Sequence, residues 1–207
     1  MIRPRILVTC WRRPLPTYLG ERTVLDTLDP AYAGRVADAG GLPLVLSRPP
    51  GEPAQVVEEV LALADGLLLT GGGDVDPASY GAEPENVEDP DAGADAWELA
   101  AGSRVQRALG GDRIAVNTIH HHEIADAGEL EVTATAPGGV IEAIEPRSEW
   151  PCVGVQWHPE KMGEPEQAGL FAQLVGAARE RSAVASDRSR VASDRSAVAS
   201  DRSGAPA

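Results

Sequence analysis

The sequence has little basic charge. Its 207 residues include 18 lysines and arginines against 32 aspartates and glutamates, which gives a net charge of −14. A surface that binds the phosphate backbone of a nucleic acid needs clustered basic side chains, so this balance argues against a nucleic-acid partner. The 43% share of hydrophobic residues is ordinary for a globular protein, and the length suits one α/β domain.

Long apolar runs are also missing. No segment approaches the ~20 consecutive apolar residues that span a bilayer, and the N-terminus has basic residues without the apolar core of a signal peptide. We therefore expect a cytoplasmic protein with no membrane partner. The chain has two cysteines, Cys10 and Cys152, which we expect to be reduced thiols in that compartment rather than a disulfide.

Apolar strands and amphipathic helices alternate in the first 70 residues. The pattern predicts strands over residues 5–10, 42–46 and 66–69, helices over residues 30–39 and 53–64, and a polar loop over residues 11–18. Strands that alternate with helices imply a parallel sheet covered by helices on both faces.

The second half of the chain gives a coarser pattern. We expect a helix around residues 94–99, a strand over 113–117, an antiparallel pair over 131–136 and 140–144, a buried strand over 152–157 and a closing helix over 164–181. From Ser182 onward a seven-residue motif repeats with one valine per repeat, which offers no paired coiled-coil seam. We therefore predict a domain over residues 1–181 and a disordered tail over residues 182–207.

A glycine-rich turn, residues 70–77, follows the strand over residues 66–69. It lacks the Lys-Ser/Thr pair of a P-loop and the third, helix-opening glycine of a dinucleotide fingerprint. Two interpretations remain open: a turn that needs a positive φ angle, or backbone N–H groups that face a developing oxyanion.

The segment Gly154-Val155-Gln156-Trp157-His158-Pro159-Glu160 places a histidine at the end of a strand. Side chains two residues apart in an extended chain point the same way, so Glu160 can reach His158 and fix its tautomer. The pair has the composition of a general base with its orienting carboxylate. Taken alone, it could also be a solvated turn.

Three segments together resemble the γ-glutamyl-γ-aminobutyrate hydrolase family, a branch of the class I glutamine amidotransferase-like proteins. They are Gly72-Gly73-Asp74-Val75-Asp76-Pro77 through Tyr80-Gly81, then Asn117-Thr118-Ile119-His120-His121, then the segment that ends in His158-Pro159-Glu160. The resemblance implies a doubly wound, flavodoxin-like α/β fold: a parallel sheet with helices on both faces. It also implies a Cys-His-Glu triad that hydrolyses a γ-glutamyl amide through a thioester.

The resemblance assigns roles to six residues. His158 and Glu160 match the catalytic histidine and glutamate, the backbone at Gly72 and Gly73 matches part of the oxyanion hole, and His120 and His121 match a motif beside the substrate cleft. His122 stands where the family usually has glutamine. Three consecutive histidines lack the Cys or carboxylate spacing of a metal site, so we expect neither a metal nor a cofactor.

The nucleophile of the triad is missing. In the family, a strand, a sharp Gly-x-Cys-x-Gly turn and a helix follow the counterpart of Trp97-Glu98, whereas here only residues 99–115 fill that interval. A single βα crossover alone takes roughly 30 residues. The sequence therefore predicts an internal deletion that removes a central strand–helix unit together with the nucleophile.

No other residue is a good substitute. Cys152 opens the strand that leads to His158, so it is expected roughly 20 Å away at the opposite sheet edge. Cys10 ends the first strand at the correct edge but follows no strained turn, and Ser103 lacks the second glycine of a nucleophile elbow.

Three functions stay open at this point. The first is a family member that is catalytically inactive as written, through a genuine deletion or a faulty gene model. The second is a binding or regulatory module that captures a γ-glutamyl compound or associates with another chain, including a homo-oligomer. The third is a divergent hydrolase that uses Cys10.

Overall fold

The computed structural model describes residues 2–47, 53–71, 96–120 and 122–184. A parallel sheet lies at the N-terminal end of the chain, with strand order β4-β1-β5. Its central strand β1 (Arg5–Thr9) pairs in parallel with β4 (Leu42–Leu46) on one side and with β5 (Gly66–Leu68) on the other. The three strands predicted for this region are confirmed, and the fold is α/β.

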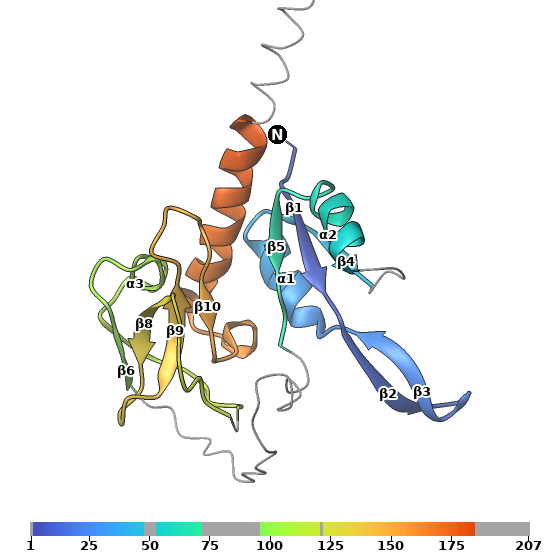
Figure 1. The fold of residues 1–207 in the computed structure, drawn as a ribbon, viewed down its shortest axis with the longest axis horizontal. Coiled ribbons are helices and arrows are strands. Elements are labelled where there is room, and N and C mark those ends of the chain that lie inside the picture. Colours follow the sequence, from blue (N-terminus) through green and yellow to red (C-terminus); the bar gives the residue numbers. More distant parts are fainter. Residues whose placement is uncertain (1, 48–52, 72–95, 121, 185–207) are drawn as a thin grey trace, which may run out of the picture.

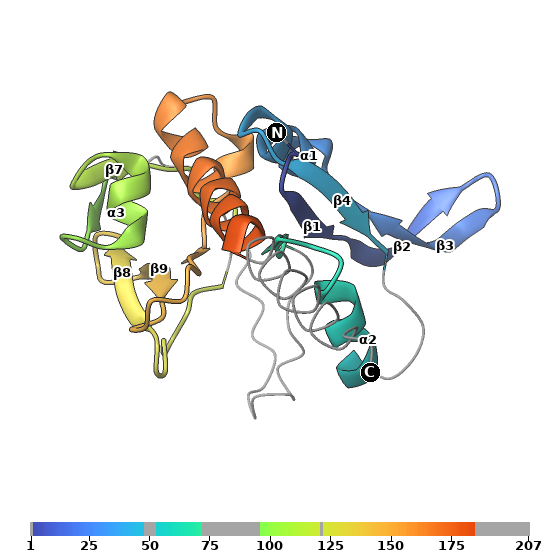
Figure 2. The same ribbon diagram turned by 90° about the horizontal axis from the view of Figure 1, so that it is seen from above.

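Helices cover both faces of the parallel sheet. The side chain of Asp29 accepts the N–H of Ala31 at the start of α1 (Pro30–Asp38), and Val36 of this helix packs on Ile6 and Val8 of β1. Helix α2 (Pro53–Leu61) lies on the opposite side of the sheet from α1, as Figure 2 shows. The alternation of strands and helices therefore predicted the layers correctly.

The C-terminal helix, defined here as residues 168–184, follows a 3-10 turn at Pro165–Gln167. Phe171, Val175 and Ala178 of this helix join the core around β1. The prediction placed the helix over residues 164–181, so it begins later than expected. Residues 182–184 of the predicted tail are helical, and residues 185–207 lie outside the described residues.

The second sheet is antiparallel throughout, with strand order β10-β9-β8-β6-β7. Its strands are β6 (Ala96–Leu99), β7 (Arg113–Ala115), β8 (Glu131–Thr135), β9 (Ile141–Glu145) and β10 (Gly154–Val155). The antiparallel pair β8–β9 confirms the prediction. Helix α3 (Arg104–Leu109) packs on this sheet through a core of Val105, Leu109, Val116, Ala134, Ala143 and Trp157.

Three sequence predictions were wrong. The helix expected around residues 94–99 is strand β6, because pairing with β7 and β8 overrides the helix preference of Ala, Glu and Leu. The loop expected over residues 11–18 belongs to a hairpin of β2 (Trp11–Thr17) and β3 (Gly20–Thr27). The strand expected over residues 152–157 is reduced to Gly154–Val155, since only these residues pair with β9.

The two main sheets are separate. Within the described segments, no strand joins the outer edge of β5 to the antiparallel sheet. The C-terminal helix lies between the two sheets in Figure 1, and Leu170 and Phe171 at its start pack on opposite cores. None of the helices in the described ranges is both long and apolar enough to cross a membrane.

Candidate functional site

His158 and Glu160 form a hydrogen-bonded pair at the end of β10. The Nδ1 atom of His158 lies 2.8 Å from Oε1 of Glu160, and the Glu160 side chain is buried while that of His158 is 29% exposed. Pro159 starts a 3-10 turn (Pro159–Lys161) that curls the chain so that Glu160 faces back to the histidine. The structure therefore brings together the two residues that the sequence predicted as base and orienting carboxylate.

Asn117 fixes the backbone of His158. Its side-chain Oδ1 accepts the His158 N–H at 2.9 Å, and its Nδ2 donates to the His158 carbonyl, also at 2.9 Å. Asn117 lies two residues beyond β7, so this amide acts as a strand-like link between two chain segments that are not otherwise paired there. The position of the histidine is thus set by backbone bonds as well as by Glu160.

Tyr32 and Gly71 line the pair from the parallel sheet. A Cβ atom added at Gly71 would lie 3.5 Å from Cε1 of His158 and 3.6 Å from the Tyr32 hydroxyl oxygen. Burial, with the Glu160 carboxylate beside it, raises the pKa of Tyr32 to about 12, so the phenol stays protonated. The second oxygen of Glu160, Oε2, is buried and has no hydrogen bond of normal geometry, although the Tyr32 hydroxyl lies close to the carboxylate.

Two contacts hold the 3-10 turn against α1. Lys161 forms an ion pair with Asp29, the residue that caps α1, and Arg35 of α1 donates to the Met162 carbonyl. The hydrogen bond from Lys161 holds the pKa of Asp29 below its ordinary value. The catalytic-type pair therefore sits at the junction of α1, the end of β5 and the end of β10.

His120 lies beside a second buried carboxylate. Its Nε2 atom is 3.2 Å from Oε1 of Glu142, and its Nδ1 is 3.0 Å from the carbonyl of His122. Gln156, two residues before His158, donates to the same His122 carbonyl. Burial raises the pKa of Glu142 to about 8, which favours a protonated carboxyl at neutral pH. The segment that the resemblance placed beside the cleft is thus anchored on β9.

Neither cysteine is an activated thiol. Cys10 follows β1 directly, and burial together with the charge of Asp26 raises its pKa. Burial also raises the pKa of Cys152. A nucleophilic cysteine needs the opposite shift, toward thiolate.

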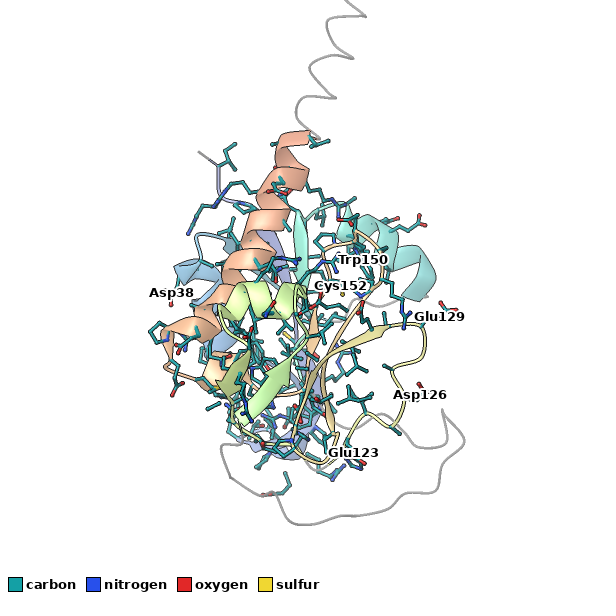
Figure 3. All side chains as sticks on the ribbon, turned by 90° about the vertical axis from the view of Figure 1, so that its left-hand side faces the viewer. Asp38, Glu123, Asp126, Glu129, Trp150 and Cys152 are labelled. Atoms are coloured by element: carbon teal, nitrogen blue, oxygen red, sulfur yellow. The ribbon has the colours of Figure 1, made fainter. Side chains whose placement is uncertain are left out.

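Cys152 also lies at the wrong end of the sheet. The register of β10 on β9 pairs Gly154 with Ile144, which places Cys152 toward the Glu145 end and His158 toward the Ile141 end. Figure 3 shows Cys152 at the end of this sheet that is opposite to Glu123. The geometric exclusion made from the sequence agrees with this arrangement.

The interval where the family carries its nucleophile holds α3. The Ser103 hydroxyl accepts the Gln106 N–H as the helix N-cap, so it has a structural task. The buried carboxylate of Glu145 accepts the N–H groups of Arg104 and Val105 at 2.9 and 2.8 Å. Together these residues satisfy the first N–H groups of α3 and leave no reactive group at its start.

Some predicted site residues cannot be placed. Gly72, Gly73 and His121 lie outside the described residues. Within the described segments, no group of three or more His, Cys, Asp or Glu side chains has the geometry of a metal site.

Sequence reasoning missed three residues near the pair. Tyr32 gave no signal, because a single tyrosine in a helix is ordinary core composition. Glu142 reads as an exposed position of an alternating strand, and only the fold shows that it is 1% exposed. Asp29 was recognisable as a helix cap before Pro30, but its contact with Lys161 depends on the tertiary structure.

The arrangement can orient a proton acceptor. Because Glu160 engages Nδ1, the other ring nitrogen, Nε2, is the one left to exchange a proton with a reactant. This is the chemistry of a general base. Covalent catalysis would also need a nucleophile beside that nitrogen.

The model of the Peptidase C26 family matches this chain over residues 19–101 and 87–160. "Putative glutamine amidotransferase Rv2859c" of Mycobacterium tuberculosis is 32% identical, with 71% of this chain and 66% of that protein covered. CTP synthase of Caulobacter vibrioides is 35% identical over 40% of this chain and 16% of its own length. The chain thus spans just under two thirds of the first relative and about a sixth of the second.

Solved structures show the same fold. A GMP synthase-like protein of Thermoplasma acidophilum aligns with a TM-score of 0.61 at 13% identity, covering 90% of this chain and 99% of that one. The glutaminase domain of the Trypanosoma brucei CTP synthase aligns with a TM-score of 0.59 at 14% identity, covering 86% and 94%. With the family match over most of the domain, these findings mean that the chain belongs to the Peptidase C26 family of class I glutamine amidotransferase-like proteins.

Proposed function

We propose that this chain is a non-hydrolytic member of its family that binds a γ-glutamyl compound. The observation that carries the proposal is the intact His158–Glu160 pair without a usable thiol: the carboxylate still orients the imidazole, but both cysteines have raised pKa values. Hydrolysis through a thioester requires a cysteine sulfur to attack the amide carbon while His158 takes its proton. Without that sulfur the covalent route is closed.

We attribute the missing nucleophile to an internal deletion. The family model matches in two pieces that meet around residues 87–101, rather than in one. The alignment with the mycobacterial relative runs over 206 positions but contains 71% of this chain, or about 147 residues, so many positions of the relative have no counterpart here. The unpaired outer edge of β5 in the described fold is compatible with the loss of a neighbouring strand.

The ligand class follows from the family resemblance and the chemistry of its relatives. Relatives named glutamine amidotransferases act on glutamine, which is itself the simplest γ-glutamyl amide. The retained surroundings of the pair, Tyr32, Gly71 and Asn117, are held by hydrogen bonds and close packing. A preformed site of this kind can bind without turnover, since binding needs no nucleophile.

Calorimetry and a glutamate-release assay test the two parts separately. We expect heat of binding with glutamine or γ-glutamyl-γ-aminobutyrate and no release of glutamate above the buffer rate. Tyr32→Phe keeps the ring but removes the hydroxyl beside Gly71, so it should weaken binding without unfolding the chain. Binding heat that is unchanged in Tyr32→Phe, or absent from the wild-type protein, would contradict the binding role.

The same assay examines residual hydrolysis. Glutamate release that disappears in His158→Ala would show that the pair is catalytically competent. Comparison with Cys10→Ser then identifies the nucleophile, because loss of turnover in that variant assigns it to the thiol at the end of β1. Release that persists in both variants belongs to a contaminant.

A further inference from the structure

The β2–β3 hairpin projects from the domain as an arm, defined here as residues 11–27 (Figures 1 and 2). Its two strands pack mainly on each other. Val24 in β3 is 62% exposed, and Tyr18 and Leu19 at the tip are 96% and 70% exposed. A two-stranded hairpin alone is marginally stable in water, so an arm of this length gains from a further strand.

The two edges of the arm differ. Strand β2 contains Pro14 and Pro16, which lack the N–H that an added strand would need, so this edge is blocked. Strand β3 contains no proline, and no strand within the described segments pairs with its outer edge. An added strand can therefore join the arm only along β3.

The proline positions also fix which backbone groups face outward. A strand accommodates proline where the missing N–H would point away from its partner. Pro14 is the cross-strand partner of Val24, and Arg12 is that of Asp26. The N–H and C=O groups of Val24, and by alternation those of Arg22 and Asp26, therefore point to the open edge of β3.

The charges of β3 match a second copy of itself. If two β3 strands pair antiparallel with Val24 on the two-fold axis, Arg22 of each copy lies opposite Asp26 of the other. Arg22 has no ion pair among the described residues, while Asp26 already accepts Arg12 at 2.7 Å and lies ready to bridge a second guanidinium. The neighbouring two-fold register, centred on Thr23, sets Arg22 opposite Val24 and makes no charge pair.

We propose that two copies of this chain dimerise through the arms, with their β3 strands paired antiparallel about Val24. The product is a four-stranded sheet in the order β2-β3-β3-β2, whose outer edges are both closed by prolines. The interface is isologous, so each copy contributes the same residues, and association stops at two. This inference does not depend on the proposed function.

Light scattering after size exclusion, on the full chain over a range of concentrations, tests the proposal. We expect a dimer for the wild-type protein. Arg22→Glu places like charges opposite each other at two symmetric positions and should weaken the dimer at least tenfold. Arg3→Glu makes the same charge change at an exposed residue outside the arm and should leave the dimer intact. Thermal unfolding of both variants shows whether they remain folded.

Cross-linking distinguishes this interface from association through the tip. In a Cys10→Ser, Cys152→Ser background, Val24→Cys should be joined into a covalent dimer by a short bis-maleimide. Tyr18→Cys should not, because the arm tips point in opposite directions in the proposed dimer. A monomeric wild-type protein, a dimer that resists Arg22→Glu, or preferential cross-linking through Tyr18→Cys would each overturn the proposal.

Discussion

The side-chain amide of Asn117 bonds both backbone polar groups of His158, at 2.9 Å in each direction. This relationship replaces a strand ladder at the point where β10 has ended. The imidazole of His158 is then held by two independent restraints: Asn117 on its backbone and Glu160 on its ring. A general base needs such restraint, because an imidazole that turns freely presents the wrong nitrogen for much of the time.

Replacing Asn117 with aspartate separates these restraints. The variant keeps the acceptor for the His158 N–H but sets a carboxylate oxygen against the His158 carbonyl, which loses its donor. We expect a loss of about 1–3 kcal/mol in the free energy of unfolding, measured with urea. Hydrogen exchange at the amides of residues 158–160 should become faster. Unchanged exchange there would mean that Asn117 does not fix this turn.

Glu142 should make stability depend on pH. Its pKa in the fold is raised by burial to about 8 from 4.5, so the native state keeps a proton that the unfolded chain has lost. The contribution to stability is complete below pH ~4.5 and is lost as pH rises through about 8. Glu142→Gln, which cannot ionise, should flatten this slope and be more stable than wild type above pH 8 by on the order of 1–2 kcal/mol.

Chemical denaturation between pH 5 and pH 9 measures this difference. Glu131→Gln provides the control, because Glu131 is an exposed residue of the neighbouring strand β8 and loses the same charge. A stability profile for Glu142→Gln that runs parallel to wild type would show that the carboxyl ionises normally in the fold.

The parts of the fold that were predictable are those set by local pattern. The strands around Ile6, Val45 and Leu67 could be read from short apolar runs between helices, and Asp29-Pro30 marked the start of α1. The His158–Glu160 contact was predictable because two-residue spacing is a property of the extended chain itself. These features need no knowledge of distant residues.

The errors arise where distant pairing decides the structure. Trp97 and Glu98 lie in a segment of good helix formers, yet their backbone pairs with Ile114 and Thr135, residues from two other strands. The β2–β3 hairpin was missed because Pro14 and Pro16 suggest a loop, whereas an edge strand tolerates them. The burial of Glu142 beside His120 depends on how the segment before Ile124 crosses the sheet, which no local pattern encodes.

Glu145 should stabilise α3 through its buried carboxylate. The two oxygens accept the N–H groups of Arg104 and Val105 and also pair with the Arg104 guanidinium at 3.3 Å. Glu145→Gln keeps the size but gives one N–H group an amide donor in place of an acceptor. We expect a loss of about 2 kcal/mol in the free energy of unfolding, because a buried donor is left unsatisfied. Glu131→Gln, whose residue pairs with Glu145 across the strands, should change it by less than about 0.5 kcal/mol.

Gly169 should be the position of the C-terminal helix least tolerant of a side chain. A Cβ atom there would collide with the backbone carbonyl of Ala108 at the end of α3, an atom that cannot turn aside as a flexible side chain would. The close approach joins the C-terminal helix to the antiparallel sheet, where Trp157 also donates to buried Gln167. Gly169→Ala must therefore push the two helices apart or unfold their contact.

The matched control is Gly176→Ala in the same helix, where an added Cβ meets nothing within 4 Å. Alanine is the better helix former by roughly 1 kcal/mol, so this variant should be more stable than wild type. Gly169→Ala gains the same helix preference and should still lose about 1–3 kcal/mol from the collision. Thermal unfolding of the two single variants and the double variant then isolates the packing term. Equal stabilisation in both single variants would contradict the close packing of α3 on the C-terminal helix.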